Sequence, residues 1–376
     1  MTSERPSLAL LRSISDEVVL RALLDTPRLT RAQLAVATGL SKPTAAEAIR
    51  RLEAANLVHD TGERTSGRGG VGSYYALTDA AGVALAVAIA PDAVVVEVLD
   101  PAGTVIDRVR EAVRQPATPA TVTTLLRKAA RQLLRGRPPQ SVRVAVVSAA
   151  DPVDRASGDL VQLPDAPFLL GAMSPRTALR PLLAGPVLVD NDVNWAALAE
   201  RDARLAQGQD LQDFVYLYLG EGLGCAVVAD GAVRRGHRGI AGEIAHVTVA
   251  GPDGAALPFT EIFARMGLRR PGSTAIDVDR LLDALHRPAG DRTVILQAVC
   301  DVVAAAIAFC DPECIVLGGP WGTDKALLDS LRRDLDSHPR SIPLDRAVST
   351  DEPSLSGART AAVSALRTDI VARIAH

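Results

Sequence analysis

The sequence predicts an α/β protein in which a winged helix-turn-helix domain precedes a two-lobed domain of alternating strands and helices. The first 60 residues show helical periodicity, with capping residues at the correct distances. A pair of short strand patterns around a glycine-rich loop follows, and from about residue 82 strand and helix patterns alternate. The chain of 376 residues is long enough for two or three domains.

The composition favours a soluble globular protein, with 48% hydrophobic and 23% charged residues and a net charge of −3. This charge argues against a general polyanion binder, although a small DNA-binding domain can be part of such a chain. The four cysteines are scattered, which predicts a reducing compartment, no disulfide framework, no metal and no cofactor. The apolar run at residues 82–99 is interrupted by Pro91, Asp92 and Glu97, so we expect two buried strands and no membrane segment. Because the N-terminus also lacks the pattern of a secretory signal, the expected location is the cytoplasm.

Helix boundaries in the first domain are marked by capping residues. Thr30 and Gln33 have the spacing of a capping box, and Gly39 provides a turn. Ser41 can cap a further helix that tolerates Pro43 in its first turn. The order of helix, capped helix, glycine turn and capped helix predicts a helix-turn-helix that binds double-stranded operator DNA. An ordinary three-helix bundle is the alternative.

The last helix of this motif separates apolar from polar positions. Its inward face carries Ala45, Ala48, Ile49 and Leu52. On its outward face we expect Lys42, Thr44 and Ala46 near base edges and two arginines near phosphates. The full set of predicted DNA-binding residues is Ser41, Lys42, Pro43, Thr44, Ala46, Arg50, Arg51 and Arg68.

The wing is predicted from residues 57–58 and 73–77, which can pair as two strands. The loop between them contains Arg68 within residues 67–70, which are otherwise glycine. An arginine at the tip of a flexible loop can enter the narrow minor groove of A·T-rich DNA. A solvated loop without DNA contact is the alternative for Arg68.

The remaining 300 residues predict strands that end in polar or glycine-rich segments. Strand patterns occupy residues 82–90, 93–106, 142–150, 186–190, 214–219, 223–229 and 313–320, and helix patterns occupy residues 118–134 and 294–310. One strand ends directly at Asn191 and Asp192. Because α/β folds bind ligands at strand ends, we expect a ligand site there.

Five features in a fixed order carry a resemblance to a known family. A winged helix is followed by VDNDVNWAALAE, LGEGLG, GHRGIAGEIAH and CIVLGGP. Over nearly its whole length the chain resembles the ROK family of repressors, open reading frames and sugar kinases. The resemblance implies an actin-like, ribonuclease-H-like ATPase fold, usually dimeric. Family members are sugar kinases or, with a winged helix in front, sugar-responsive transcription factors.

The resemblance also implies domain boundaries. Residues 1–80 would form the winged helix-turn-helix domain and residues 81–184 the first ROK lobe. Residues 185–359 would form the second lobe, and the C-terminal helix at residues 360–376 would complete the first.

Five side chains are assigned to sugar binding by the same resemblance. Asn191 and Asp192 would contact sugar hydroxyls, with Asp192 at the position of the kinase base. Glu243 and His246 would also contact the sugar, and Glu261 would replace the acidic residue that follows the family's cysteine cluster. Carboxylates and amides form the directed hydrogen bonds that polyols need. A surface or capping role is the alternative for each of them, and Asp192 can cap the helix that follows.

Two departures from the family affect nucleotide binding. Residues 88–92 lack the acidic residue and the glycine of the kinase phosphate loop, and Pro91 removes an amide donor. In the second phosphate turn, residues 220–224, Glu221 would place a carboxylate beside nucleotide phosphates. We therefore expect that the chain is not an enzyme, because phosphoryl transfer needs positioned phosphates, metal and base together.

Two further departures affect the metal and the sugar. No cysteine lies between His246 and Glu261, so the family's zinc site is not expected. Asp165 replaces a sugar-contacting asparagine of the family. The sequence thus predicts a repressor of carbohydrate-related genes that responds to a sugar or sugar phosphate as a homodimer or homotetramer. The alternatives are a ROK sugar kinase with a DNA-binding head and a regulator without a sugar ligand.

Overall fold

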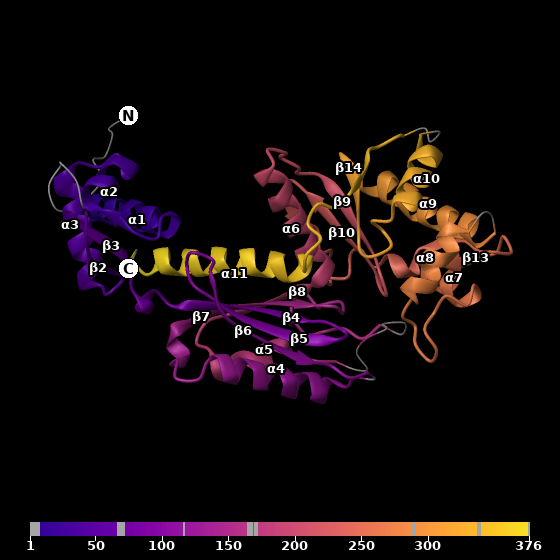
Figure 1. Cartoon of the computed structure of the whole chain (residues 1–376), viewed down its shortest axis with the longest axis horizontal. Coiled ribbons are helices and arrows are strands. Elements are labelled where there is room, and N and C mark those ends of the chain that lie inside the picture. Colours follow the sequence, from indigo (N-terminus) through magenta and orange to yellow (C-terminus); the bar gives the residue numbers. More distant parts are fainter. Residues whose placement is uncertain are drawn as a thin grey trace.

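The computed structural model describes residues 8–65, 72–115, 117–163, 168, 172–287, 290–336 and 340–374. The predicted positions Arg68 and Asp165 lie outside these residues. Figure 1 shows an elongated molecule with a small helical domain at one end, a first lobe in the middle and a second lobe at the other end. The α/β class and the order of the domains agree with the prediction.

The N-terminal domain is a winged helix-turn-helix. Its helices are α1 (Leu8–Asp25), α2 (Arg31–Thr38) and α3 (Lys42–Ala54), and its strands are β1 (Leu29–Thr30), β2 (Val58–Arg64) and β3 (Ser73–Leu77). The strands form an antiparallel sheet in the order β1-β3-β2. The predicted inward residues Ala45, Ala48, Ile49 and Leu52 are all buried.

The predicted caps of this domain are present. Thr30 Oγ1 accepts a hydrogen bond from the Gln33 amide at 3.2 Å, and Gln33 Oε1 accepts one from the Thr30 amide at 2.9 Å. Gly39 ends α2 with φ of 68°, a left-handed conformation that favours glycine. Ser41 Oγ then accepts from the Thr44 amide at 3.2 Å and starts α3. Local sequence therefore determines how α3 is presented to solvent.

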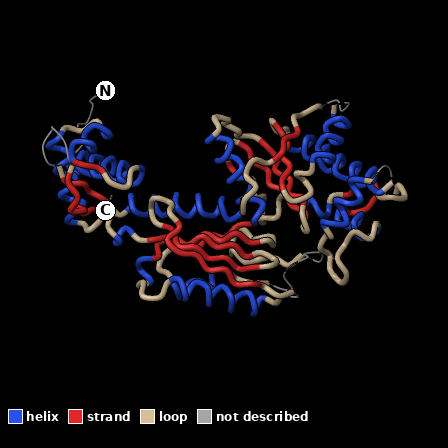
Figure 2. The backbone as a smooth tube through the Cα atoms, viewed as in Figure 1, coloured by secondary structure: helices blue, strands red, loops and turns tan. Residues whose placement is uncertain are grey.

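The first lobe contains a five-stranded sheet in the order β6-β5-β4-β7-β8. Its strands are β4 (Val83–Ile89), β5 (Ala93–Leu99), β6 (Val105–Ala112), β7 (Val142–Ala149) and β8 (Val187–Asn191). Figure 2 shows this sheet as a layer between helices, with α4 (Pro119–Leu133) below and α11 (Pro353–Ala372) above. Strand β8 pairs with β7, so the first sheet extends beyond the predicted boundary at residue 184. A short helix α5 (Pro175–Leu179) precedes β8.

The second lobe contains a sheet in the order β11-β10-β9-β14-β15. These strands are β9 (Phe214–Leu219), β10 (Leu223–Ala229), β11 (Ala232–Val233), β14 (Cys314–Gly318) and β15 (Leu344–Arg346). Helix α6 (Asp192–Ala206) packs on one face. The other face is covered by helices α7 (Phe259–Arg265), α8 (Val278–His286), α9 (Asp291–Cys310) and α10 (Lys325–Leu335). A hairpin of β12 (Thr248–Ala250) and β13 (Ala256–Pro258) precedes α7.

Helix α11 lies across β4 and β7 and beside α6. It begins at residue 353 rather than 360, because Pro353 stands in its first turn, where no amide donor is needed. Gly357 allows α11 to approach α6 closely, since a Cβ there would lie 2.0 Å from the Trp195 carbonyl oxygen. At the far end, Leu366 and Ile370 share a hydrophobic core with Val19 of α1. The C-terminal helix thus packs on the first-lobe sheet and also contacts the DNA-binding domain.

Helix α9 is the one helix of the described residues that is long and apolar enough to cross a membrane by length and composition. Core helices of globular proteins pass the same test. Ile295, Val299 and Val303 bury one side of α9 against the second-lobe core.

Candidate ligand cavity and DNA-binding surface

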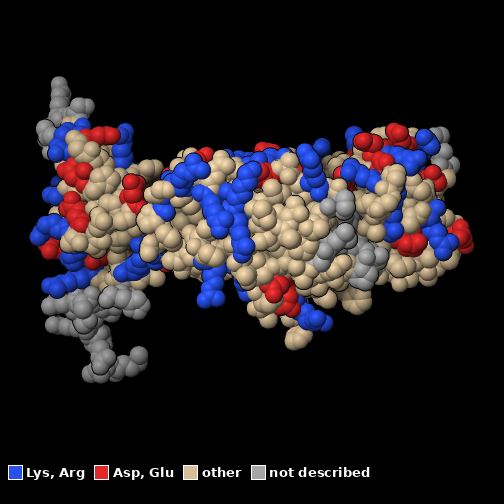
Figure 3. Space-filling model, turned by 90° about the horizontal axis from the view of Figure 1, so that it is seen from below, with Lys and Arg blue, Asp and Glu red and all other residues tan. Residues whose placement is uncertain are grey.

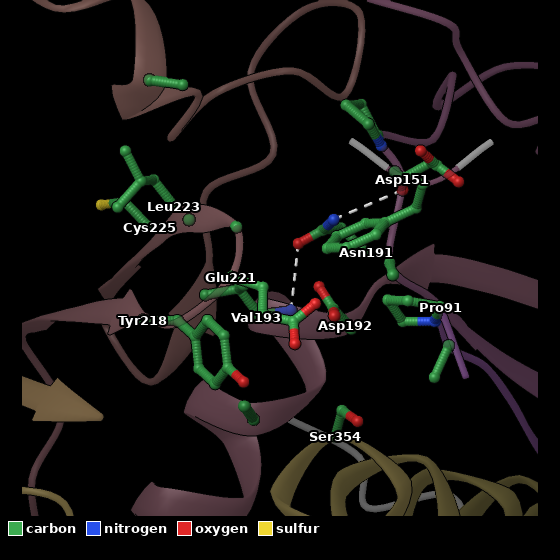
Figure 4. A pocket seen from close by; sticks show the side chains of 18 of the residues that line it. Pro91, Asp151, Asn191, Asp192, Val193, Tyr218, Glu221, Leu223, Cys225 and Ser354 are labelled. Atoms are coloured by element: carbon green, nitrogen blue, oxygen red, sulfur yellow. Dashed lines mark hydrogen bonds between the residues drawn. The ribbon is translucent and has the colours of Figure 1, made fainter. Parts of the chain in front are cut away.

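A cavity of about 650 Å³ lies where the two lobes meet. Its walls come from the β4–β5 turn, the end of β7, the start of α6, the β9–β10 turn and the N-terminus of α11. Figure 4 shows Pro91 and Asp151 of the first lobe on one side and Tyr218 and Glu221 of the second lobe on the other. Such a volume accommodates a small organic ligand.

The junction of β8 and α6 places Asn191 and Asp192 at this cavity. Asn191 Oδ1 accepts a hydrogen bond from the Val193 amide at 3.0 Å, and its Nδ2 donates to the Asp151 carbonyl oxygen at 3.3 Å (Figure 4). Asn191, not Asp192, is therefore the helix cap, and α6 starts at Asp192. The capping alternative for Asp192 is wrong, and its carboxylate is left facing the cavity.

A buried polar cluster that sequence reasoning missed supports this junction. Asp190 accepts hydrogen bonds from Asn194 Nδ2 at 2.7 Å and from Arg235 Nε at 2.6 Å. The same carboxylate accepts from the Asn191 amide at 2.9 Å. Because Arg235 belongs to the second lobe and Asp190 to β8, this cluster ties the lobes together beside the cavity.

Three carboxyl groups of the cavity interact electrostatically with one another. Burial raises the pKa of Asp192 to about 7, with a further contribution from Asp151, while the amides of Val193 and Asp192 oppose the rise. Burial and then Glu243 raise the pKa of Asp151 to about 7. Burial and then Asp192 raise the pKa of Glu243 to about 7. Perturbed carboxyl groups in a cleft are typical of functional sites.

Asp151 is the cavity residue that sequence reasoning overlooked. It follows β7 after one residue, much as Asp192 follows β8 directly. Because β7 and β8 are parallel neighbours, their carboxyl ends lie at the same edge of the sheet. An acidic residue directly after the strand pattern at residues 142–150 was therefore the available signal.

Glu243 and His246, which are predicted to contact a sugar, also line the cavity. Glu243 directly precedes the 3₁₀ turn Ile244–His246, and His246 is its last residue. Gly242 has φ of 95°, and a Cβ there would lie 2.0 Å from the Cys225 carbonyl oxygen. This close approach to β10 holds Glu243 beside the other two carboxylates.

Glu261 is not brought into the cavity. Strand β13 leads directly into α7, and the neighbouring Thr260 lines the cavity instead. The Glu261 side chain is 41% exposed and lies 3.7 Å from Arg269 and 4.0 Å from Arg265. The prediction that Glu261 lies in the sugar site is therefore corrected: it lies outside the cavity wall. Adjacent side chains of a helix point in different directions, so Thr260 faces the cavity and Glu261 does not.

In both turns that correspond to phosphate loops, polar groups form bonds with other groups of the protein. In the β4–β5 turn, the Ala90 amide donates to the Ala93 carbonyl oxygen at 2.9 Å, and Pro91 has no amide hydrogen. In the β9–β10 turn, the Gly220 amide donates to Gly222 at 3.0 Å. Glu221 forms a 2.5 Å ion pair with Arg270 at the cavity wall. One amide of each turn is thus already bonded within the protein, and Pro91 has none to donate.

The predicted DNA-binding surface is exposed at the start of α3. Ser41, Lys42, Pro43 and Thr44 are exposed, and Ala46 is half-buried. On the face of this domain that Figure 3 shows, cationic side chains are mixed with acidic ones, which weakens the nonspecific attraction of that face for phosphates.

The two predicted phosphate contacts on α3 differ. Arg50 is exposed and pairs with Glu47 on the same helix. Arg51 instead binds Asp16 of α1 with Nε and Nη2, at 2.9 and 2.6 Å. The structure thus uses Arg51 to hold α3 against α1.

Comparison with known proteins establishes the family of the larger domain. Residues 84–262 match the ROK family, and residues 12–59 match winged helix-turn-helix DNA-binding domains. The chain carries a ROK domain. The chain therefore has a winged helix-turn-helix domain in front of a ROK domain, which is the arrangement that its resemblance predicted.

Curated relatives of the ROK domain include sugar kinases. The bifunctional enzyme NanE/NanK of Brucella suis is 37% identical over 164 residues, which are 42% of this chain and 30% of that protein. The β-glucoside kinase of Listeria innocua is 30% identical over 46% of this chain and 63% of that protein. The chain therefore spans less than two thirds of these relatives. An N-acetylmannosamine kinase of Salmonella typhi is 28% identical and is covered over 88% of its length.

Solved structures share the fold. A ROK family transcriptional regulator, a homologue of the E. coli MLC protein, superposes with a TM-score of 0.63 at 18% identity. The match covers 96% of this chain and 99% of that chain. A ROK family glucokinase from Streptomyces griseus, in complex with glucose and AMPPNP, has a TM-score of 0.52 at 22% identity over 75% of this chain.

Proposed function

We propose that this protein is a cytoplasmic transcriptional repressor of carbohydrate-related genes, and that a sugar-type effector in the cavity controls its binding to operator DNA. One observation carries the proposal. Helix α11 touches the cavity with its first turn, through Pro353 and Ser354, and touches the DNA-binding domain near its other end. A single rigid element thus connects the two sites (Figure 1).

The contact between α11 and the DNA-binding domain is specific. Arg367 donates to the Leu24 carbonyl oxygen at the end of α1 and to the Pro101 carbonyl oxygen of the β5–β6 turn, both at 2.8 Å. Arg373 donates to the Ala81 carbonyl oxygen at 2.6 Å. Because of these bonds, we expect a change in the orientation of α11 to change the orientation of α1.

Regulation then requires that the effector prefers one arrangement of the lobes. The cavity walls belong to both lobes, so a bound effector changes the free-energy difference between their arrangements. Helix α11 lies along α6 and across β4 and β7, and it carries the change to α1. A helix of 20 residues spans about 30 Å, enough to connect sites that share no direct contact.

In this proposal the exposed start of α3 enters the major groove. Lys42, Thr44 and Ala46 lie near base edges, and Arg50 contacts phosphates. Arg68 keeps its proposed role in the minor groove. Two copies of the chain bind the two halves of a pseudo-palindromic operator, as a homodimer or homotetramer.

The cavity has no built nucleotide site in this proposal. The Ala90 amide is already bonded, Pro91 cannot donate, and the Glu221–Arg270 pair occupies the second turn. Asp192 therefore orients a ligand hydroxyl and does not act as a catalytic base.

One observation favours a sugar kinase as the second candidate. The pKa of Asp192 is raised to about 7, a value suited to proton transfer at neutral pH. Incubating the protein with ATP, magnesium and a panel of hexoses, while measuring ADP, separates the two functions. Turnover at about 1 s⁻¹ or faster, the usual range of kinases, would establish a kinase. The proposal of a repressor that lacks catalytic activity would then be wrong.

The repressor is tested with fluorescently labelled DNA from the regions flanking its own gene. We expect binding to a pseudo-palindromic site, measured by fluorescence anisotropy, and its weakening by one compound of a sugar panel. The same compound should raise the Tm of the protein, because it binds only the folded state. Sequence-independent DNA binding that no sugar affects would contradict the proposal.

A further inference from the structure

Asp151 is a buried carboxylate without a partner. Its side chain lines the cavity, although the residue is only 5% exposed. In the part of the chain that the structure describes, its carboxylate accepts no hydrogen bond and forms no ion pair. The nearby Asp190, buried to a similar extent, is satisfied by Asn194 and Arg235. The Asp151 oxygens are not among the fully enclosed side-chain atoms without partners, so they reach the space of the cavity, where a ligand can supply the missing partner.

The carboxylates next to Asp151 do not receive a cation from the protein either. Among the described residues, neither Asp192 nor Glu243 forms an ion pair, and both line the same cavity. Arg270 also lines it, but this guanidinium is held by Glu221 at 2.5 Å. The cavity wall therefore carries an excess of negative charge.

The other charged groups of the cavity wall do not neutralise this negative charge. Asp92, Asp279 and Glu352 are further acidic members of the cavity wall. Asp92 pairs with Arg110, and Glu352 pairs with Arg108 and Arg359. His246 also lines the cavity. Asp92 and Glu352 therefore have cationic partners, whereas Asp151, Asp192 and Glu243 form no ion pair among the described residues.

We propose that the effector of this cavity is an amino sugar with a free, protonated amine, and that the ammonium group binds between Asp151, Asp192 and Glu243. This inference rests on the proposed function as a sugar-responsive regulator and narrows its ligand class. An ammonium group brings three donors, a positive charge and no acceptor, which matches carboxylates that form no ion pair within the protein. Ring hydroxyls can bind the remaining polar groups of the wall. The same negative charge opposes a phosphate-bearing sugar.

Binding of such a ligand is coupled to proton release. The pKa values of the three carboxyl groups are raised to about 7, so near neutral pH each is partly protonated. An ammonium group favours the ionised forms and lowers these pKa values, so protons leave when it binds. A neutral sugar has no such effect, which makes proton release a signature of the amine.

Calorimetry on the full chain at pH 7 tests the inference. The probes are D-glucosamine, D-mannosamine and D-galactosamine, each compared with its N-acetyl derivative and its parent hexose. We expect one amino sugar to bind about tenfold more tightly than its neutral counterparts, the effect of one charge-assisted hydrogen bond. Its heat of binding should depend on the ionisation enthalpy of the buffer, which reports released protons.

Variants test the role of Asp151. In Asp151→Asn the ratio of affinities for the amino sugar and its parent hexose should fall toward one, and proton release should decrease. Asp107→Asn, which removes an exposed carboxylate of β6 outside the cavity wall, should change neither. Melting curves of both variants show whether they remain folded.

The outcomes separate this inference from the proposed function. If a parent hexose or an N-acetyl derivative binds most tightly, the proposed amine is wrong, and the sugar-responsive regulator still stands. An amino-sugar preference that persists in Asp151→Asn would overturn the assigned site. If no sugar binds with or without an amine, the sugar-responsive part of the proposed function fails together with this inference.

Discussion

At the residue scale, the cavity contains three buried carboxyl groups that lower the stability of the protein without ligand. They belong to Asp151, Asp192 and Glu243. Their pKa values are raised to about 7 by burial and by one another. In the unfolded chain such carboxyl groups titrate near pH 4. Between about pH 4 and pH 7 the folded protein binds more protons than the unfolded chain. The free energy of unfolding therefore falls as the pH rises from about 4 to about 7.

Asp151→Asn should therefore stabilise the protein without ligand at alkaline pH. The amide keeps the shape of the side chain but has no charge to bury. We expect the Tm at pH 8 to rise by roughly 2 °C or more, and to rise less at pH 5, which lies close to the pKa of an aspartate in the unfolded chain. A scan of melting temperature against pH measures the effect. An equal shift at both pH values would show that the charge is not the cause.

Asp192→Ala should abolish the response to the effector and leave operator binding intact. The residue lines the cavity and is remote from α3, so only the ligand loses a contact. Anisotropy of operator DNA, with and without the effector, measures both properties. An undiminished response would remove Asp192 from the proposed site.

Helix α3 is the clearest case at the scale of the element, because neighbouring arginines on it have different roles. Arg50 points to solvent, whereas Arg51 binds Asp16 of α1 in a partly buried ion pair. The Asp16 carboxylate also raises the pKa of Arg51. One arginine is thus available to DNA, and the other supports the domain.

Alanine variants should separate these roles. Arg51→Ala should lower the free energy of unfolding by roughly 1–2 kcal/mol, because it removes charge-assisted hydrogen bonds. Arg50→Ala should leave stability nearly unchanged, weaken operator binding and reduce its salt dependence by about one ion. Chemical denaturation and salt titrations of DNA binding measure the two effects. Equal loss of stability in both variants would refute the distinction.

At the scale of the whole molecule, α11 connects the cavity to the DNA-binding domain. Arg367→Ala removes its bonds to Leu24 and Pro101. We expect effector affinity and operator affinity, measured separately, to remain within about threefold of the original. The change in operator affinity caused by the effector should decrease, since the link between the sites is weaker. A full response in this variant would exclude the hydrogen bonds of Arg367 as the connection.

The exposed end of α9 concerns the assembly of the molecule. Phe309 is 90% exposed, and Ala308 beside it is exposed as well. If this apolar end contacts a second copy, Phe309→Glu should produce monomers, because a charge cannot be buried there without a partner. Sedimentation velocity measures the change, and Val36→Glu, at an 85% exposed residue of α2, is the matched control. Unchanged dimers would place the interface elsewhere.

Local signals in the sequence determined the DNA-binding domain and the order of the strands. The capping box at Thr30, the left-handed Gly39 and the Ser41 cap depend on residues within four positions of one another, so the sequence alone predicts them. The buried strands β4, β5 and β7 are likewise continuous apolar runs. The placement of Asn191 and Asp192 at a strand end followed from the same patterns.

Tertiary structure alone decided which side chains share the cavity. Asp151, Asp192 and Glu243 come from three separate segments, and their shared pKa shifts exist only when burial brings them together. The exclusion of Glu261, the inward pairing of Arg51 and the reach of α11 from the cavity to α1 also depend on contacts between distant segments. Periodicity and spacing report only neighbours along the chain, so they cannot show such contacts.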